Sequence, residues 1–248
     1  MKIIGALSWF NESPLWLTKT IASFARVCDQ VVAVDGRYAL FDHDFDWSPA
    51  AEPDAVVAAA EAVGLPLTLH VPREPFAGNE VEKRNLLMRL AMVHAEPMED
   101  WIFVLDADEY IVHVDPTFRD ELAATEEHIV GHALEEYLDP YVALGQDGGV
   151  ARFTTLPTTW RVDLRGFYRA LPGLSYVGTH FTIGGYVDGE WVWLWGHPDK
   201  VPQRDLREML IVRHENPRRV ALRRELAAGY YAARDELGIE SPDVLAPT

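Results

Sequence analysis

The stretch Trp101-Ile102-Phe103-Val104-Leu105-Asp106-Ala107-Asp108-Glu109 decides the fold that we expect for this chain. Its first five residues are all apolar, which is typical of a strand buried on both faces of a parallel sheet. Asp106 stands where that strand ends, and Asp108 follows at the alternate position. Ligands of open parallel α/β sheets bind beyond the carboxyl ends of the strands. The stretch therefore predicts a central strand that delivers two carboxylates to a ligand site.

The hundred residues before this stretch alternate between strand-like and helix-like patterns. Ser13-Pro14 predicts the start of one helix, and Gly64-Leu65 predicts the end of another. Apolar periodicity predicts strands at 3–8, 30–34 and 65–71. It also predicts three helices, of which the first begins at Pro14, the second is the alanine-rich segment that ends at Gly64, and the third covers about 79–95. This alternation predicts an α/β, Rossmann-like fold with a mostly parallel central sheet and helices on both faces.

The second half of the chain has a different character. Short strand-like runs at 151–154, 166–169 and 191–195 predict a mixture of sheet and loops. Asn216-Pro217 predicts the start of a last helix that runs to Gly238. We therefore divide the chain into three parts, which are one half of a domain (1–112), the second half of the same domain (113–215), and a C-terminal helix with a tail (216–248).

Composition narrows the classes of function. A net charge of −17 argues against a general affinity for nucleic acid, because an acidic surface repels phosphate. The single cysteine, Cys28, allows no internal disulfide and no cysteine-based zinc site. No apolar run approaches the roughly 18 residues that span a bilayer. We expect a cytoplasmic protein without stable membrane insertion.

The spacing of Asp106 and Asp108 suits a hard metal ion. Carboxylates at alternate positions can both turn toward one cation while Ala107 faces away. Mg²⁺ or Mn²⁺ would take these oxygens and complete its shell with substrate phosphate oxygens and water. Such a cation neutralises a diphosphate leaving group. Asp-x-Asp alone is a weak signal, and its place after a buried strand strengthens it.

Four motifs in order resemble glycosyltransferase family 2. They cover about the first 110 residues, and they are Trp9-Phe10-Asn11-Glu12, Val31-Val32-Ala33-Val34-Asp35-Gly36, Glu82-Lys83-Arg84-Asn85 and Val104-Leu105-Asp106-Ala107-Asp108-Glu109. The resemblance implies a GT-A fold and a hexosyltransferase-type enzyme. It also implies transfer of a sugar from a UDP- or GDP-type donor to an acceptor hydroxyl with inversion. Residues 1–112 would then form the donor half and 113–215 the acceptor half.

The resemblance also assigns roles to individual residues. Asn11, Glu12, Asp35, Arg84 and Asp106 would bind the donor, with Asp35 at its base or ribose and Arg84 near its base or diphosphate. The metal would lie on Asp106 and Asp108. Each position also has a plainer interpretation, since Asn11-Glu12 can simply end a strand, Asp35-Gly36 is a common turn pair, and Arg84 can pair with Glu80 one helical turn earlier.

Histidines and carboxylates of the second half supply further candidates. His180 and His214 are candidate metal ligands, because an imidazole can complete an Asp-x-Asp site. Phe181 stands where the resemblance would place a glutamate, which leaves no obvious catalytic base. Asp188 and Glu190 are the remaining candidates for that base, although Val187-Asp188-Gly189-Glu190 also matches a hairpin turn, which we favour.

Two other functions stay open. A non-catalytic carbohydrate-binding or assembly protein could be built on the same scaffold. A nucleotidyltransferase would also use a doubly wound sheet with acidic metal ligands, but it usually carries a glycine-rich, basic loop where this chain has Trp9-Phe10-Asn11-Glu12. The stereochemistry and the acceptor, which could be a lipid, glycan, protein, small molecule or modified DNA, are not determined by these patterns.

Overall fold

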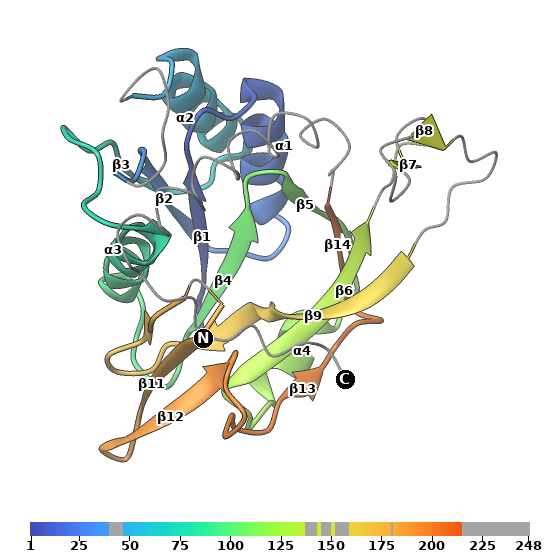
Figure 1. The fold of residues 1–248 in the computed structure, drawn as a ribbon. Coiled ribbons are helices and arrows are strands. Elements are labelled where there is room, and N and C mark those ends of the chain that lie inside the picture. Colours follow the sequence, from blue (N-terminus) through green and yellow to red (C-terminus); the bar gives the residue numbers. More distant parts are fainter. Residues whose placement is uncertain (40–46, 137–142, 145–149, 152–158, 180, 215–248) are drawn as a thin grey trace.

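A computed structural model describes residues 1–39, 47–136, 143–144, 150–151, 159–179 and 181–214 as an α/β protein (Figure 1). The helices are α1 (Pro14–Phe24), α2 (Ala51–Val63), α3 (Glu80–Met92) and α4 (Phe118–Ala123). The strands are β1 (Ile3–Trp9), β2 (Gln30–Asp35), β3 (Leu67–His70), β4 (Trp101–Asp106), β5 (Glu109–Val114), β6 (Ile129–Glu136), β7 (Ala143–Leu144), β8 (Val150–Ala151), β9 (Thr159–Arg169), β10 (Ser175–Tyr176), β11 (Ile183–Val187), β12 (Glu190–Trp195), β13 (Arg204–Asp205) and β14 (Leu210–His214).

Most of the described strands belong to one large sheet with the order β3-β2-β1-β4-β9-β6-β14-β5. The first four strands run parallel, as the alternation of strands and helices predicts. From β4 onward the sheet is mixed, because β9 is antiparallel to both β4 and β6 while β14 is parallel to β6 and antiparallel to β5. The α/β, Rossmann-like fold class is confirmed, with the parallel part limited to the first half of the chain.

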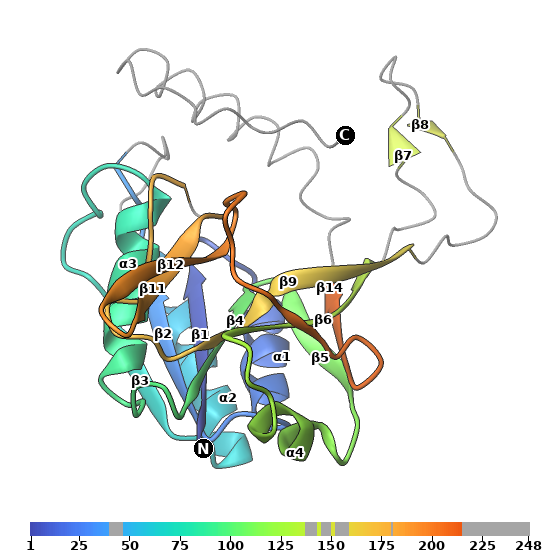
Figure 2. The same ribbon diagram turned by 90° about the horizontal axis from the view of Figure 1, so that it is seen from below.

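Strands β1, β2 and β4 are buried on both faces, and their alternate residues belong to two apolar cores. Ile3 and Leu7 of β1 pack in the core under α1 and α2, whereas Ile4 and Ala6 pack in the core under α3. Figures 1 and 2 show α1 and α2 on one side of the sheet and α3 with the small sheet β10-β11-β12 on the other. Alternation with period two explains why these strands are apolar throughout.

The predicted element boundaries in the first half are close to those observed. Gly64 ends α2 in the left-handed conformation (φ 65°), which a glycine adopts without steric cost. Asn79 caps α3 by accepting a hydrogen bond from Val81 N–H at 2.9 Å. Pro14 opens α1 as expected, but the Ser13 side chain makes no capping hydrogen bond. Ser13 instead donates its N–H to the Glu12 carboxylate at 2.8 Å.

The second half combines antiparallel strands and loops, as expected. The predicted strand at 166–169 is the end of β9, and the run at 191–195 is most of β12. Residues 152–154 and the predicted helix from Asn216 to Gly238 lie outside the described residues. Among the described residues, no helix combines the length and the apolar character that crossing a bilayer requires.

Phe103 of β4 lies at the centre of the core under α1. Its ring stacks on Phe167 of β9 with centroids 4.0 Å apart and meets Phe24 of α1 edge-on at 5.8 Å. All three side chains are fully buried. These rings therefore join the parallel half of the sheet to its mixed half and to α1.

We expect Phe103→Ala to lower the free energy of unfolding by about 3–5 kcal/mol, because it leaves a cavity among rings that cannot close over it. Urea denaturation followed by circular dichroism measures this change. Val93→Ala, at a side chain that is 77% exposed, is the matched control and should change the stability by less than about 0.5 kcal/mol. Equal stabilities of the two variants would contradict this account of the core.

Candidate functional site

The carboxyl ends of the parallel strands bring Asp35 and Asp106 to one edge of the sheet. Trp9, the last residue of β1, pairs with Asp35 of β2, and Ser8 pairs with Asp106 of β4. Asn11 and Glu12 follow β1 directly. Segments that lie up to a hundred residues apart in the sequence therefore meet at this edge, which we call the carboxyl edge.

Asp106 and Asp108 occupy a tight turn between β4 and β5. The Glu109 carboxylate closes the turn by accepting the N–H of Asp106 at 2.9 Å. The Asp106 side chain is 38% exposed, whereas Asp108 is almost fully buried. Ala107 is also buried and faces α1, where its carbonyl accepts a hydrogen bond from Thr20. The two carboxylates thus differ in solvation, and Asp106 is the more accessible to a ligand.

Arg84 reaches the turn from α3. Its guanidinium donates to Glu80 at 2.6 Å and to Asp106 at 2.9 Å. The side chain is 11% exposed and lies 5.9 Å from the ring centroid of Tyr176. The expected pair with Glu80 therefore exists, and the same guanidinium also contacts the acidic turn. Arg84 is fixed between two carboxylates and an aromatic ring, in a position to meet an anionic ligand that approaches Asp106.

His214 reaches the same turn from the end of β14. Its Nε2 lies 3.5 Å from Asp108 Oδ2, and β14 pairs with β5 so that His214 stands opposite Glu109. Burial lowers the pKa of His214, but the hydrogen bond and charge of Asp108, with Glu109 and Asp106 nearby, raise that pKa above its usual value. The structure therefore brings His214 to Asp108. His180 lies outside the described residues.

A second group of carboxylates lies beside the turn, at the ends of β1 and β2. Asp35 is buried and accepts hydrogen bonds at 2.6 Å from Gly36 N–H and from the Ser48 hydroxyl. Glu52 of α2 is also buried and accepts the N–H of Glu12 at 2.9 Å. Burial raises the pKa of Asp35, and burial together with the nearby Asp35 charge raises the pKa of Glu52 to about 7.

Lys83 is the cation of this second group, and the sequence motif that contains it predicts no role for its side chain. The side chain is 4% exposed, and its ammonium donates to the backbone carbonyl of Trp9. Burial lowers the pKa of Lys83 to about 8, although the charges of Asp35, Glu80 and Glu52 oppose that shift. One signal was available in the sequence, because Lys83 falls on the same helical face as the buried Leu87.

Asn11 and Glu12 support the loop after β1. Asn11 has a positive φ of 51° and donates its N–H to Ser48 Oγ at 3.1 Å. Glu12 is buried, and its carboxylate accepts the N–H of Ser13. The plainer interpretation, in which the pair ends a strand, describes these contacts, and Asn11 also shares the Ser48 hydroxyl with Asp35.

Asp188 and Glu190 do not join the carboxyl edge. Asp188 (φ 52°) and Gly189 (φ 84°) form the turn of the β11–β12 hairpin, in which Val187 pairs with Glu190. The charge of Asp188 acts on His128, and the carbonyl of His128 accepts the N–H of Arg169, which pairs with Trp101 at the start of β4. The hairpin turn therefore lies toward the opposite end of the sheet from Asp106, and it gives no catalytic base at the carboxyl edge.

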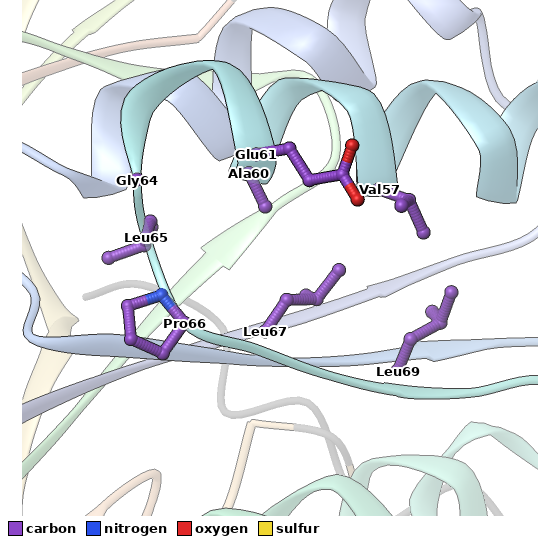
Figure 3. Close-up of a pocket in the computed structure, with 8 residues that line it drawn as sticks. All are labelled: Val57, Ala60, Glu61, Gly64, Leu65, Pro66, Leu67 and Leu69. Carbon is purple, nitrogen blue, oxygen red and sulfur yellow. The ribbon is translucent and has the colours of Figure 1, made fainter.

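A pocket of about 520 Å³ lies between α2 and β3, also away from the carboxyl-edge residues (Figure 3). Glu61 contributes a single carboxylate over an otherwise apolar lining. The lining residues are Val57, Ala60, Glu61, Gly64, Leu65, Pro66, Leu67 and Leu69. The pocket offers no cation for a phosphate group, so we place no nucleotide there.

Among the described residues, the turn does not by itself make a complete metal site. Within the described part of the chain, no three His, Cys, Asp or Glu side chains form a group that could hold a metal by themselves. Mg²⁺ in proteins commonly takes only one or two carboxylates and completes its shell with phosphates and water. Asp106 and Asp108 together supply two carboxylates. His214 Nδ1 is buried and has no hydrogen-bond partner among the described residues.

Comparisons with known proteins give only distant similarity to solved structures. No protein-family model matches the chain, and no curated protein matches it. One similar solved structure is a Bacillus anthracis protein described as a glucose-1-phosphate thymidylyltransferase (11% identity, 68% of this chain, 72% of that chain, TM-score 0.39). Another is 4-diphosphocytidyl-2C-methyl-D-erythritol synthase from Anaerococcus prevotii (12% identity, 68% of this chain, 70% of that chain, TM-score 0.31). A third is a synthase of the same name (14% identity, 68% of this chain, 74% of that chain, TM-score 0.33).

Likeness at this level says nothing about what the present chain binds or catalyses. The resemblance to glycosyltransferase family 2 has no match in these comparisons and stays an expectation.

The raised pKa of Glu52 gives a pH-dependent stability. A carboxyl that binds its proton more tightly in the folded state stabilises the fold fully below its unfolded pKa of 4.5, and this stabilisation is lost as the pH rises to about 7. Relative to Glu52→Gln, we expect the wild-type free energy of unfolding to fall by about 1–3 kcal/mol between these pH values. Urea denaturation at pH 4.5, 5.5, 6.5 and 7.5 measures the difference. Glu61→Gln, at an exposed position of the same helix, is the control. Parallel wild-type and Glu52→Gln profiles would refute the proposed cause.

Proposed function

We propose that this chain is a metal-dependent glycosyltransferase that moves a sugar from a nucleoside-diphosphate sugar to an acceptor hydroxyl. The proposal places the donor on residues 1–112, with the diphosphate at the turn of Asp106 and Asp108. A UDP- or GDP-type donor with Mn²⁺ or Mg²⁺ is the expected pair. The acceptor would be bound by residues 113–215.

The observation that carries the proposal is the contact of Arg84 with Asp106. The guanidinium and the carboxylate come from different elements, α3 and the end of β4, and they meet at the carboxyl edge at 2.9 Å. A ligand that combines a diphosphate with a divalent cation matches this pair, because the phosphate can take the guanidinium while the cation takes the carboxylates. An isolated phosphate would satisfy only the guanidinium of Arg84, and an isolated metal ion would satisfy only the carboxylate of Asp106.

The buried group beside the turn fits the other end of such a donor. Asp35 is held by Gly36 and Ser48 in one orientation, and its carboxylate lies at the same edge as Asp106. An ionised carboxylate accepts hydrogen bonds from hydroxyl and N–H groups, which a ribose and a nucleobase both carry. Asp35 would therefore orient the nucleoside while Arg84 and the turn hold the diphosphate.

The bound cation would supply neutralisation of the charge that develops on the departing diphosphate. The protein's own residues would do the rest. Arg84 would hold a phosphate oxygen by a charge-assisted hydrogen bond, and Asp35 would keep the nucleoside in place. His214 lies against Asp108 and would orient that carboxylate. Among the described residues, Asp188 and Glu190 lie away from this edge, so neither would act there as the base for the acceptor hydroxyl.

Thermal-shift measurements with UDP, GDP, CDP and dTDP test the proposal, each with and without Mn²⁺. We expect at least one diphosphate to raise the melting temperature only when Mn²⁺ is present, because binding to the folded state stabilises it by mass action. Asp108→Asn should abolish most of this increase. Asp199→Asn, the same chemical change at a side chain that is 85% exposed, is the control and should retain the increase.

The products separate the proposal from its rivals. A glycosyltransferase releases a nucleoside diphosphate from the sugar nucleotide, whereas a nucleotidyltransferase releases pyrophosphate from a nucleoside triphosphate and a sugar phosphate. A carbohydrate-binding protein would take up free glycan without nucleotide. Metal-independent turnover that survives Asp108→Asn, or pyrophosphate release in place of diphosphate release, would refute the proposed function.

A further inference from the structure

One flank of α1 lies along β5, which ends the large sheet in the part of the chain that the structure describes. Thr20 and Ser23 lie three residues apart on this flank, Arg26 follows the end of the helix, and each bonds to the backbone near β5. Ser23 Oγ accepts the N–H of Ile111 at 3.0 Å, and Arg26 donates to the carbonyl of Ile111 at 3.0 Å. Polar side chains of α1 thus satisfy backbone groups along the edge of the sheet.

Thr20 differs from the other two because it contacts the Asp106–Glu109 turn itself. Its hydroxyl lies 3.0 Å from the carbonyl of Ala107 and 2.6 Å from the carbonyl of Glu109. A hydroxyl has one proton to donate, so it serves one of these two carbonyls at a time. Thr20 is completely buried, and water does not reach it as a substitute donor. Both carbonyls therefore lie within hydrogen-bond reach of this one side chain of α1.

The contact fixes the peptide that joins Ala107 to Asp108. In a trans peptide the C=O and the N–H point in opposite directions, so a carbonyl held toward α1 sets the direction in which Asp108 leaves the turn. From the other side, the Glu109 carboxylate holds the N–H of Asp106. The turn is thus fixed at both ends, by Glu109 within the turn and by Thr20 from the helix.

We propose that Thr20 is a positioning residue of the site, whose hydroxyl holds the Asp106–Glu109 turn so that Asp106 and Asp108 face the metal and the diphosphate together. This inference rests on the proposed function, because it takes these two carboxylates as the groups that meet the ligand. Thr20 itself is buried and touches no ligand. Removing its hydroxyl leaves both carboxylates in the sequence but releases the peptide between them.

The test compares three variants of Thr20. Thr20→Val keeps the shape of the side chain and removes the hydroxyl, Thr20→Ala removes the hydroxyl without overpacking, and Thr20→Ser keeps it. The probes are Mn²⁺ alone, titrated by electron paramagnetic resonance, and UDP or GDP with Mn²⁺, titrated by calorimetry. We expect the hydroxyl-free variants to bind both probes about 10- to 100-fold more weakly, as loss of an outer-shell partner does at metal sites. Thr20→Ser should bind within about twofold of the wild type.

Ser23→Ala is the matched control, because Ser23 lies on the same flank and bonds to β5 beyond the turn. It should lower the melting temperature yet leave the affinity for Mn²⁺ unchanged, so loss of affinity in Thr20→Val is not a general effect of loosening α1. If the wild type binds a probe and the hydroxyl-free variants bind it equally well, the inference about Thr20 is wrong and the proposed function stands. If the wild type binds neither probe, the inference about Thr20 and the proposed function are both wrong.

Discussion

The site depends on the parallel pairing of β1 with β2 on one side and with β4 on the other. This register places Trp9 beside Asp35 and Ser8 beside Asp106. Because side chains alternate along a strand, a slip of one residue in either pairing would turn the carboxylate to the other face of the sheet and remove it from the site. Ile3 and Ile4 of β1 belong to different cores, so a slip would also exchange the side chains that each core receives. The same strand register therefore determines both the packing of the sheet and the positions of the carboxylates.

This register brings several carboxylates close together, and the helices and the last strand provide their counter-charges. Arg84 of α3 meets Asp106, and His214 of β14 lies against Asp108. Lys83, the neighbour of Arg84, lies within the electrostatic reach of Asp35 and Glu52. A buried charge without a partner costs several kcal/mol, so this pairing is a condition for folding. The pKa values of Glu52 (about 7) and Lys83 (about 8), both shifted toward neutrality, show that burial is only partly compensated.

Residues next to a recognisable strand could be placed from the sequence, and residues brought in by tertiary contacts could not. Asp35 and Asp106 each end a clearly apolar strand, so their meeting at one edge followed from the parallel alternation alone. Ser48 and Glu52 contact Asp35 and Glu12 across loops whose path no local pattern determines. His214 was a candidate from its motif, but its approach to Asp108 depends on the insertion of β14 between β5 and β6, a non-sequential order that periodicity does not reveal.

The claim that the Asp106–Glu109 turn holds a metal together with a diphosphate can be tested by locating the metal directly. An anomalous difference map from a crystal grown with Mn²⁺ and UDP or GDP would show the ion independently of any activity assay. We expect one strong peak in contact with the carboxylates of Asp106 or Asp108 and with phosphate oxygens, close to the guanidinium of Arg84. A nucleotide bound elsewhere, such as between α2 and β3, or a diphosphate at the turn with no metal peak, would contradict the account.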